Sequence, residues 1–372
     1  MDIVGRRPIQ LQRKLIKPAH WHLKRVSMAQ RTHQVHLIRR PEAIAKPSDF
    51  AVVEVTLPEL TEGQVLVRNL WMSVDPYMRR SMSPEATDLE PWPLNRAIDG
   101  PSIGRVLASR NPAYEAGDLV ESMSGWQEHF ISNAGHFVPY LSPSDSLVKR
   151  TAPGAEPADY VGLLGVAALT AYRGMVSLSK AKTGDTAVIS SGAGTVGSIA
   201  CQIGKAQGLR VVSSAGSPEK VQWLRDVAGV DCAFNYRTRA FAGAFLEACP
   251  KGIDLVLENA SPDHLCACLP FMNELKQVLI AGFVGTYSGD GKIGLPRNFE
   301  FVLDKFLTIQ SYRFMDSLDV YDQFVSDMLG WRSRGQLTLP IVCYDGLEQA
   351  PDALCNLFTR GHLGKSLVHL AD

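Results

Sequence analysis

The chain has 372 residues, of which 45% are hydrophobic, and its 38 basic and 38 acidic side chains give a formal net charge of zero. This length suits two domains, and the balanced charge gives no indication of a nucleic acid or another polyanion as partner. The sequence contains no apolar run of about 18 residues, so we expect no membrane-spanning helix and no membrane partner.

The cysteines favour a reducing compartment. They are odd in number, irregularly spaced and placed in segments that we expect to be buried, which suits free thiols better than a disulfide framework. We therefore predict a cytoplasmic protein. The seven residues are Cys201, Cys232, Cys249, Cys266, Cys268, Cys343 and Cys355.

The first 27 residues differ from the rest, because they carry seven basic residues and a single acid, Asp2. Two interpretations are open. The segment is either an organelle transit peptide or a disordered extension that precedes a true start at Met28. We favour the disordered extension, and the lack of a long apolar stretch argues against a secretory signal.

The rest of the chain shows two different sequence patterns. Residues 34–150 contain short apolar runs such as VLVRNLWMSV (65–74) and GDLVES (117–122), broken by Pro and Gly, which is typical of a β-rich unit. From 160 to 314, strands and helices alternate, which predicts an α/β fold with a doubly wound parallel sheet. The expected strands are 185–190, 210–216, 253–260, 276–283 and 306–314, and the expected helices are 195–208, 218–228 and 240–249.

A glycine motif, GAGTVG, lies between the first of these strands and the first helix. In a dinucleotide-binding fold, Gly192 would permit a tight turn, Gly194 would let the backbone approach a pyrophosphate, and Gly197 would allow close packing of the helix. Thr195 and Val196 open the helix, whose free N–H groups suit phosphate. An ordinary glycine-rich turn is the alternative.

The loop after the second strand predicts which nucleotide binds. An NAD site usually has Asp or Glu about 20 residues past the glycine motif. Here the strand ends in Ala215-Gly216-Ser217, and Lys220 follows. A small loop followed by a cation would accept a 2′-phosphate, so we predict NADPH as cofactor. The alternative for Lys220 is a solvated helix residue.

No metal site is predicted. Residues 1–200 contain no cysteine, and the histidines at 20, 22, 33 and 36 lack the thiols or carboxylates that would complete a zinc site. Cys266 and Cys268 lie in a helical stretch and are expected in the core.

Two tyrosines could donate a proton or stabilise an oxyanion without a metal. Tyr77 follows the Asp75-Pro76 turn, and Tyr287 follows the strand 276–283, at the edge where a cofactor would bind. The alternative is that each ring only packs in the core or lines the pocket.

The chain resembles the zinc-independent medium-chain dehydrogenases/reductases of the group that includes prostaglandin reductases, plant alkenal double-bond reductases and NADPH-dependent curcumin reductases. The resemblance runs from about residue 34 to the C-terminus. Its markers are LWMSVDPYMRRSM (70–82), LTAY (169–172), GAGTVGSIACQIGKAQG (192–208), FNYRT (234–238), KGIDLVLENA (251–260), AGFVGTY (281–287), MLGWRSRGQL (328–337) and GKSLV (364–368).

The resemblance implies a β-rich GroES-like catalytic domain of residues 28–157 and 333–372, around a Rossmann domain of residues 158–332. It implies that Lys220 and Tyr236 bind the 2′-phosphate region, that Tyr287 lies at the reacting enone and that Tyr77 is a pocket tyrosine. We predict Tyr287 and Tyr77 as the catalytic residues. His362 stands where the family usually has an asparagine near the cofactor. The remaining residues of the predicted cofactor set are Gly216, Asn259, Gly282, Tyr287 and Tyr312. Family members are commonly homodimers.

The expected function is NADPH-dependent reduction of the C=C bond of small α,β-unsaturated ketones and aldehydes, with hydride added to the β-carbon and the enolate stabilised by tyrosine. Two alternatives remain open. One is a quinone reductase or zinc-free alcohol dehydrogenase on the same fold, and the other is a non-catalytic NADPH-binding protein.

Overall fold

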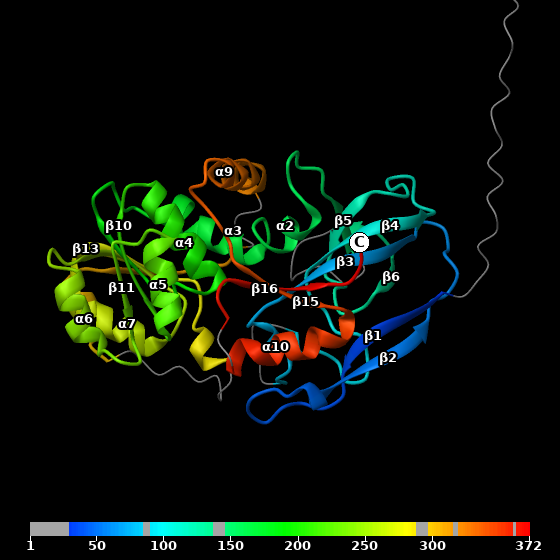
Figure 1. Cartoon of the computed structure of the whole chain (residues 1–372), viewed down its shortest axis with the longest axis horizontal. Helices are drawn as coiled ribbons and strands as arrows, with labels where there is room; N and C mark the ends of the chain where they lie inside the picture. The colour runs from blue at the N-terminus through cyan, green and yellow to red at the C-terminus, as the bar shows by residue number, and fades with distance from the viewer. Residues whose placement is uncertain (1–29, 85–89, 137–145, 288–296, 315–318, 360–361) are drawn as a thin grey trace, which may run out of the picture.

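The computed structural model describes residues 30–84, 90–136, 146–287, 297–314, 319–359 and 362–372. The N-terminal segment 1–27 and the start suggested at Met28 lie outside the described residues. Figure 1 shows a sheet flanked by helices on one side of the molecule and a β-rich part on the other. None of the helices formed by the described residues has the length and apolar character needed to cross a membrane.

The helix-flanked sheet is parallel, with strand order β11-β10-β9-β12-β13-β14. The predicted α/β fold with its Rossmann sheet is therefore confirmed. The strand order reverses between β9 and β12, which is where such sheets bind ligands at their carboxyl edge. The strands are β9 (Thr186–Ile189), β10 (Arg210–Ala215), β11 (Cys232–Asn235), β12 (Ile253–Glu258), β13 (Met272–Ile280) and β14 (Thr308–Ser311).

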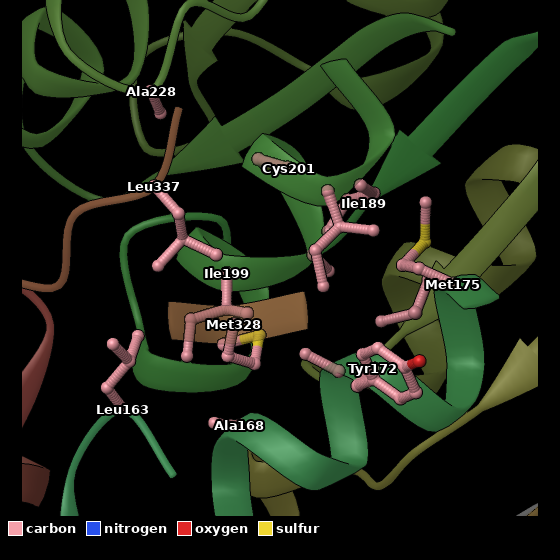
Figure 2. Packing of buried hydrophobic residues seen from close by; sticks show 14 of the residues in the cluster. Leu163, Ala168, Tyr172, Met175, Ile189, Ile199, Cys201, Ala228, Met328 and Leu337 are labelled. Carbon is pink, nitrogen blue, oxygen red and sulfur yellow. The ribbon is translucent and has the colours of Figure 1, made fainter. Parts of the chain in front are cut away.

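Both faces of this sheet are covered by helices and buried. Successive residues of a strand point to opposite faces, so they enter different buried clusters. In β9, Val188 belongs to one buried cluster and Ile189 to the other, and the same alternation recurs in β10, β12 and β13. Figure 2 shows the cluster around Ile189, to which Ile199 and Met328 also belong. Helices α3 (Val166–Tyr172), α4 (Thr195–Ala206), α5 (Pro218–Asp226) and α9 (Tyr321–Ser333) cover this face, and α6 (Phe241–Ala248) and α7 (Pro262–Cys268) cover the other.

The β-rich part is one larger sheet of order β15-β16-β3-β4-β5-β8-β7, with β6 beside β3, and a separate pair β1-β2. Strands β15 and β16 come from the C-terminus, and β16 pairs antiparallel with β3. The domain limits at 157/158 and 332/333 stay a prediction. The strands are β1 (Arg31–Leu37), β2 (Phe50–Thr56), β3 (Val65–Val74), β4 (Ser102–Ser109), β5 (Leu119–Ser122), β6 (His129–Ser132), β7 (Gly135–His136), β8 (Ser146–Lys149), β15 (Ile341–Asp345) and β16 (Lys365–His369).

Shorter elements connect these strands. Helix α10 (Ala350–Thr359) packs against β16 and β3. It covers a separate buried cluster in the β-rich part, in which Trp126 and Met78 are fully buried. The remaining elements are η1 (Pro47–Asp49), α1 (Met78–Ser81), α2 (Pro157–Val161), η2 (Arg173–Leu178), η3 (Leu269–Phe271), η4 (Val284–Thr286), α8 (Glu300–Asp304), η6 (Leu347–Gln349) and α10 (Ala350–Thr359).

Helix α4 packs so closely on the turn before it that Gly197 has no room for a side chain. A Cβ there would collide with the carbonyl oxygen of Ser191 and lie 2.8 Å from the Cα of Gly192. We expect Gly197→Ala to lower the free energy of unfolding by about 1–3 kcal/mol, because backbone must move to admit the methyl group. Urea denaturation measures this loss.

Gly243→Ala is the matched control. Gly243 lies in α6, and a Cβ there meets nothing within 4 Å. Alanine should therefore stabilise the helix by up to about 1 kcal/mol. Equal unfolding midpoints for the two variants would contradict the packing argument.

Candidate functional site

The turn between β9 and α4 has the shape that the glycine motif predicts, but for a partly different reason. The residue with left-handed backbone is Ser191 (φ 51°), not Gly192. Gly192 is required because a Cβ there would collide with the hydroxyl of Ser213 on the neighbouring strand. The motif therefore sets close contacts of the turn with both β10 and α4.

The N-terminus of α4 has no side-chain cap. Gly194 is its N-cap residue and offers no side-chain acceptor, whereas Ser217 and Ser261 accept N–H groups at the starts of α5 and α7. Gly194, Thr195 and Val196 are all partly exposed. Uncapped N–H groups at the start of a 12-residue helix are donors for an anion such as a pyrophosphate.

A second cluster lies beyond the end of β10. A Cβ on Gly216 would lie 2.7 Å from the hydroxyl of Tyr236, so the glycine leaves space for that ring. Burial, and then the nearby Arg237 guanidinium, lower the pKa of the Lys220 ammonium. Two neighbouring cations repel each other unless an anion lies with them, so this cluster suits a phosphate. We did not predict Arg237, although it follows Tyr236 in FNYRT.

The third group lies past the ends of β12 and β13, where Asn259, Gly282 and Tyr287 come together. A Cβ on Gly282 would be 3.0 Å from the hydroxyl of Tyr287 and 3.6 Å from Oδ1 of Asn259. The glycine thus lets the hydroxyl lie against the backbone at the carboxyl edge of the sheet. This edge is where a bound nicotinamide is expected in such folds.

Helix α1 (Met78–Ser81), which directly follows Tyr77, brings Arg80 close to the ring of Tyr287. Tyr77 precedes α1, and three residues later Arg80 places its guanidinium carbon 5.4 Å from the ring centroid of Tyr287. The short helix that follows the predicted turn at 75–76 therefore lies against the segment that ends β13. Arg80 was not predicted, but its spacing of three from Tyr77 puts both on one face of a helical turn.

The C-terminal strand holds the two halves together. The N–H of Gly364 donates to the carbonyl of Ala193 at 2.8 Å, and Thr195 Oγ1 donates to the carbonyl of Gly364 at 3.0 Å. The next residue, Lys365, is buried and donates to Asp75 Oδ1 at 2.6 Å. One dipeptide thus contacts the glycine turn on one side and the VDPY segment on the other.

Two further predicted cofactor residues, Tyr312 and His362, have hydrogen-bonding partners within the chain. The hydroxyl of Tyr312 donates to the carbonyl of Thr170 at 3.1 Å, and burial raises its pKa. This position gives Tyr312 a packing role against α3, and its contact with a cofactor stays a prediction. His362 lies two residues before Gly364, and its Nε2 is 3.2 Å from the hydroxyl of Tyr344.

No metal centre is evident in the residues that the structure describes, because no group of three or more His, Cys, Asp and Glu side chains is placed to hold an ion. All seven cysteines are free thiols. Cys268 is fully buried, and burial raises its thiol pKa. Cys343 is exposed, contrary to our expectation that the cysteines are buried, because it lies on the partly exposed strand β15.

Comparisons with known proteins identify similar oxidoreductases. Residues 33–139 match a family described as the N-terminal domain of oxidoreductase, and residues 195–329 match one described as zinc-binding dehydrogenase. The NADPH-dependent curcumin reductase of Escherichia coli (strain K12) is 32% identical over 92% of this chain and 98% of its own. Prostaglandin reductase 1 of Bos taurus is 33% identical over 86% of this chain and 94% of its own.

A solved structure is also similar. The crystal structure of CurA from Vibrio vulnificus in complex with NADPH has a TM-score of 0.83 and 29% sequence identity. The match covers 91% of this chain and 99% of that one. The likeness therefore extends over both sheets and the segments that join them.

The buried pair of Lys365 and Asp75 gives a test of how the two halves are joined. We expect Lys365→Met to lower the free energy of unfolding by about 3–5 kcal/mol, because the Asp75 carboxylate would stay buried without its partner. Arg31→Met is the control, since Arg31 and Glu54 form an exposed pair that should contribute less than about 1 kcal/mol. If urea denaturation gave the same loss of unfolding free energy for Lys365→Met and Arg31→Met, the buried pair would contribute no more to stability than an exposed pair.

Proposed function

This chain belongs to the zinc-independent medium-chain dehydrogenases/reductases, in the group of the curcumin, prostaglandin and alkenal reductases, and we propose that it reduces the C=C bond of α,β-unsaturated ketones and aldehydes with NADPH. The observation that carries the proposal is the hydroxyl of Tyr287, which lies against Gly282 and beside Asn259 at the carboxyl edge of the parallel sheet.

The three clusters of the site fit the three parts of the cofactor. The uncapped start of α4, at Gly194, would hold the pyrophosphate. Lys220 and Tyr236, together with Arg237, would hold the 2′-phosphate. Asn259 and Gly282 would lie beside the nicotinamide. His362 would lie near the pyrophosphate, because Gly364 forms a bridge with Gly194.

When bound, NADPH supplies a hydride to the β-carbon of the substrate. The chain's own residues act on the oxygen at the other end of the conjugated system. Tyr287 donates a hydrogen bond to this oxygen as it gains negative charge, and Tyr77 is the second candidate donor. Arg80 adds a positive charge at the ring of Tyr287, which further stabilises the enolate. The enolate then takes a proton from water at the α-carbon, which completes the saturated carbonyl product.

We also propose that the protein is a homodimer that forms through β14. In the sheet formed by the described residues, this strand is an edge strand and is largely exposed, so a second copy could pair with its backbone. Beside it, Leu275, Leu303 and Phe306 are 77%, 75% and 68% exposed, more than a monomer normally leaves uncovered in one place. A monomer in light scattering at micromolar concentration would contradict this proposal.

A cytoplasmic location is proposed from the free thiols, because a reducing compartment keeps cysteines unpaired. Cell fractionation tests it, and recovery of the protein within an organelle would favour the transit-peptide interpretation of residues 1–27.

The 2′-phosphate assignment predicts a change in cofactor preference. Lys220→Ala and Arg237→Ala should each raise KM for NADPH about tenfold or more and leave KM for NADH unchanged, because a hydrogen bond to a charged group is worth about 1.5–3 kcal/mol. Lys251→Ala, an exposed lysine just before β12, is the control. Equal effects on both nucleotides would contradict the assignment.

The reaction class and the role of Tyr287 are tested together. The wild-type protein should oxidise NADPH with enones and enals and form saturated carbonyl products. Tyr287→Phe should lower kcat by about 10²–10³-fold, as expected when one donor to the developing oxyanion is lost. Tyr321→Phe is the control, because among the described residues the buried hydroxyl of Tyr321 has no hydrogen-bond partner.

Other outcomes of this assay each point to a different conclusion. Turnover of quinones or saturated aldehydes alone would reassign the chemistry to a quinone reductase or alcohol dehydrogenase. Tight NADPH binding without any turnover would favour a binding protein. Unchanged kcat in Tyr287→Phe would remove Tyr287 from the mechanism.

A further inference from the structure

A buried polar network lies beneath the nicotinamide side of the site. Glu258 is the last residue of β12 and is fully buried. Its Oε1 accepts hydrogen bonds from Ser190 Oγ at 2.9 Å and from the N–H groups of Ala260 and Ser261 at 2.6 and 2.9 Å. Its Oε2 lies 2.6 Å from Nδ1 of His264. Three hydrogen-bonding groups thus converge on Oε1 and one on Oε2 of the same buried carboxylate.

This network reaches three strand ends at once. Ser190 follows β9, and its hydroxyl accepts the N–H of Asn259 at 2.6 Å while it faces Glu258. The backbone carbonyl of Glu258 accepts the N–H groups of Ala281 and Gly282, just after β13, at 2.8 and 3.3 Å. The side chain of Glu258 therefore holds Ser190, at the start of the glycine turn, and through Ser190 the backbone of Asn259. Its backbone carbonyl holds the backbone at Gly282.

The imidazole on the far side of Glu258 is itself held in place. His264 is buried on α7, and the rings of Phe241 and Phe245 pack edge-on against it at centroid distances of 5.1 and 5.7 Å. The Sγ of Cys268 lies 3.8 Å from Nδ1. A well-packed imidazole fixes the direction of the hydrogen bond that it shares with the carboxylate.

We propose that Glu258, held by His264, is a positioning residue that sets the geometry of Asn259, Gly282 and, through Gly282, Tyr287 for hydride transfer. The inference rests on the proposed function. Misplacement of reacting groups by about 1 Å can cost on the order of a hundredfold in rate, so the network should affect kcat. It should leave the 2′-phosphate cluster at Lys220 untouched, because that cluster lies beyond β10.

The opposite end of the same strand offers a matched control. Asp254, near the start of β12, accepts the N–H of Thr186 at 2.9 Å and bonds to Asn273 and Lys276, each at 2.9 Å. Asp254 thus ties together the amino ends of β9, β12 and β13, as Glu258 ties their carboxyl ends. Loss of Asp254 should weaken the fold without changing the site.

The experiment compares Glu258→Ala, Glu258→Gln and Asp254→Ala in the full chain. For each variant, the number of NADPH-binding sites is titrated, and kcat is measured per site with 4-phenyl-3-buten-2-one as substrate. Counting binding sites removes any effect of an unfolded fraction. The fluorescence of bound NADPH is recorded as well, because it reports the nicotinamide environment without any turnover.

We expect Glu258→Ala to lower kcat per site by about tenfold or more and to change the emission of bound NADPH, with Kd for NADPH changed far less. Glu258→Gln keeps an oxygen for Ser190, Ala260 and Ser261 and can donate to His264 in its other tautomer, but it loses the negative charge, so its kcat per site should lie between those of Glu258→Ala and the wild type. Asp254→Ala should match the wild type in both readouts.

Wild-type kcat and emission in Glu258→Ala would overturn the inference, and so would an equal fall in Asp254→Ala. If Glu258→Ala does not fold, Glu258→Gln provides the test. A positioning role predicts that Glu258→Gln changes kcat per site or the emission of bound NADPH. Wild-type values of kcat per site and of emission in Glu258→Gln would overturn the inference. A wild-type protein that binds NADPH but does not reduce the enone would refute the proposed function. The emission comparison would still test the positioning role.

Discussion

The contact between Gly364 and the glycine turn is the constraint on which the rest of the site depends. The glycine turn belongs to the parallel sheet and the VDPY segment to the β-rich sheet, so the candidate site needs residues from both sheets. Gly364 pairs with Gly194, and Lys365 then binds Asp75 in the core. Figure 1 shows why this is possible, since β16 runs between the two parts of the molecule.

This contact requires glycine at position 364. Its backbone is left-handed (φ 77°), and a Cβ would collide with the carbonyl oxygen of Pro340. The buried lysine after it costs desolvation energy, which its bonds to Asp75 and to the carbonyl of Val74 offset only in this geometry. The same pair that joins the sheets therefore also fixes the turn that presents Tyr77.

The sequence predicted the architecture well because the strongest signals are local. The run 65–74 is β3 to the residue, and the alternation after 185 matches the strands and helices of the parallel sheet within a few residues. β11 was not predicted as a strand, since four residues give too short a pattern. The need for Gly192 was predicted, but its cause, the hydroxyl of Ser213, depends on a neighbouring strand.

The parts of the site that were not predicted depend on contacts between distant residues. Glu258 and His264 look like ordinary strand and helix residues until β9 and β13 are placed beside them. Arg80 acquires a role only because it meets Tyr287, some 200 residues later in the chain. Hydrophobic periodicity and motif spacing describe local structure and cannot predict a contact between residues so far apart in the sequence.

The fate of the transferred hydrogen distinguishes C=C reduction from carbonyl reduction. NADPH deuterated at the transferable position is incubated with the protein and an enone, and the product is analysed by NMR spectroscopy. Reduction of the C=C bond should give a saturated ketone that carries deuterium on the carbon β to the carbonyl. An unsaturated alcohol with deuterium on the former carbonyl carbon would contradict it.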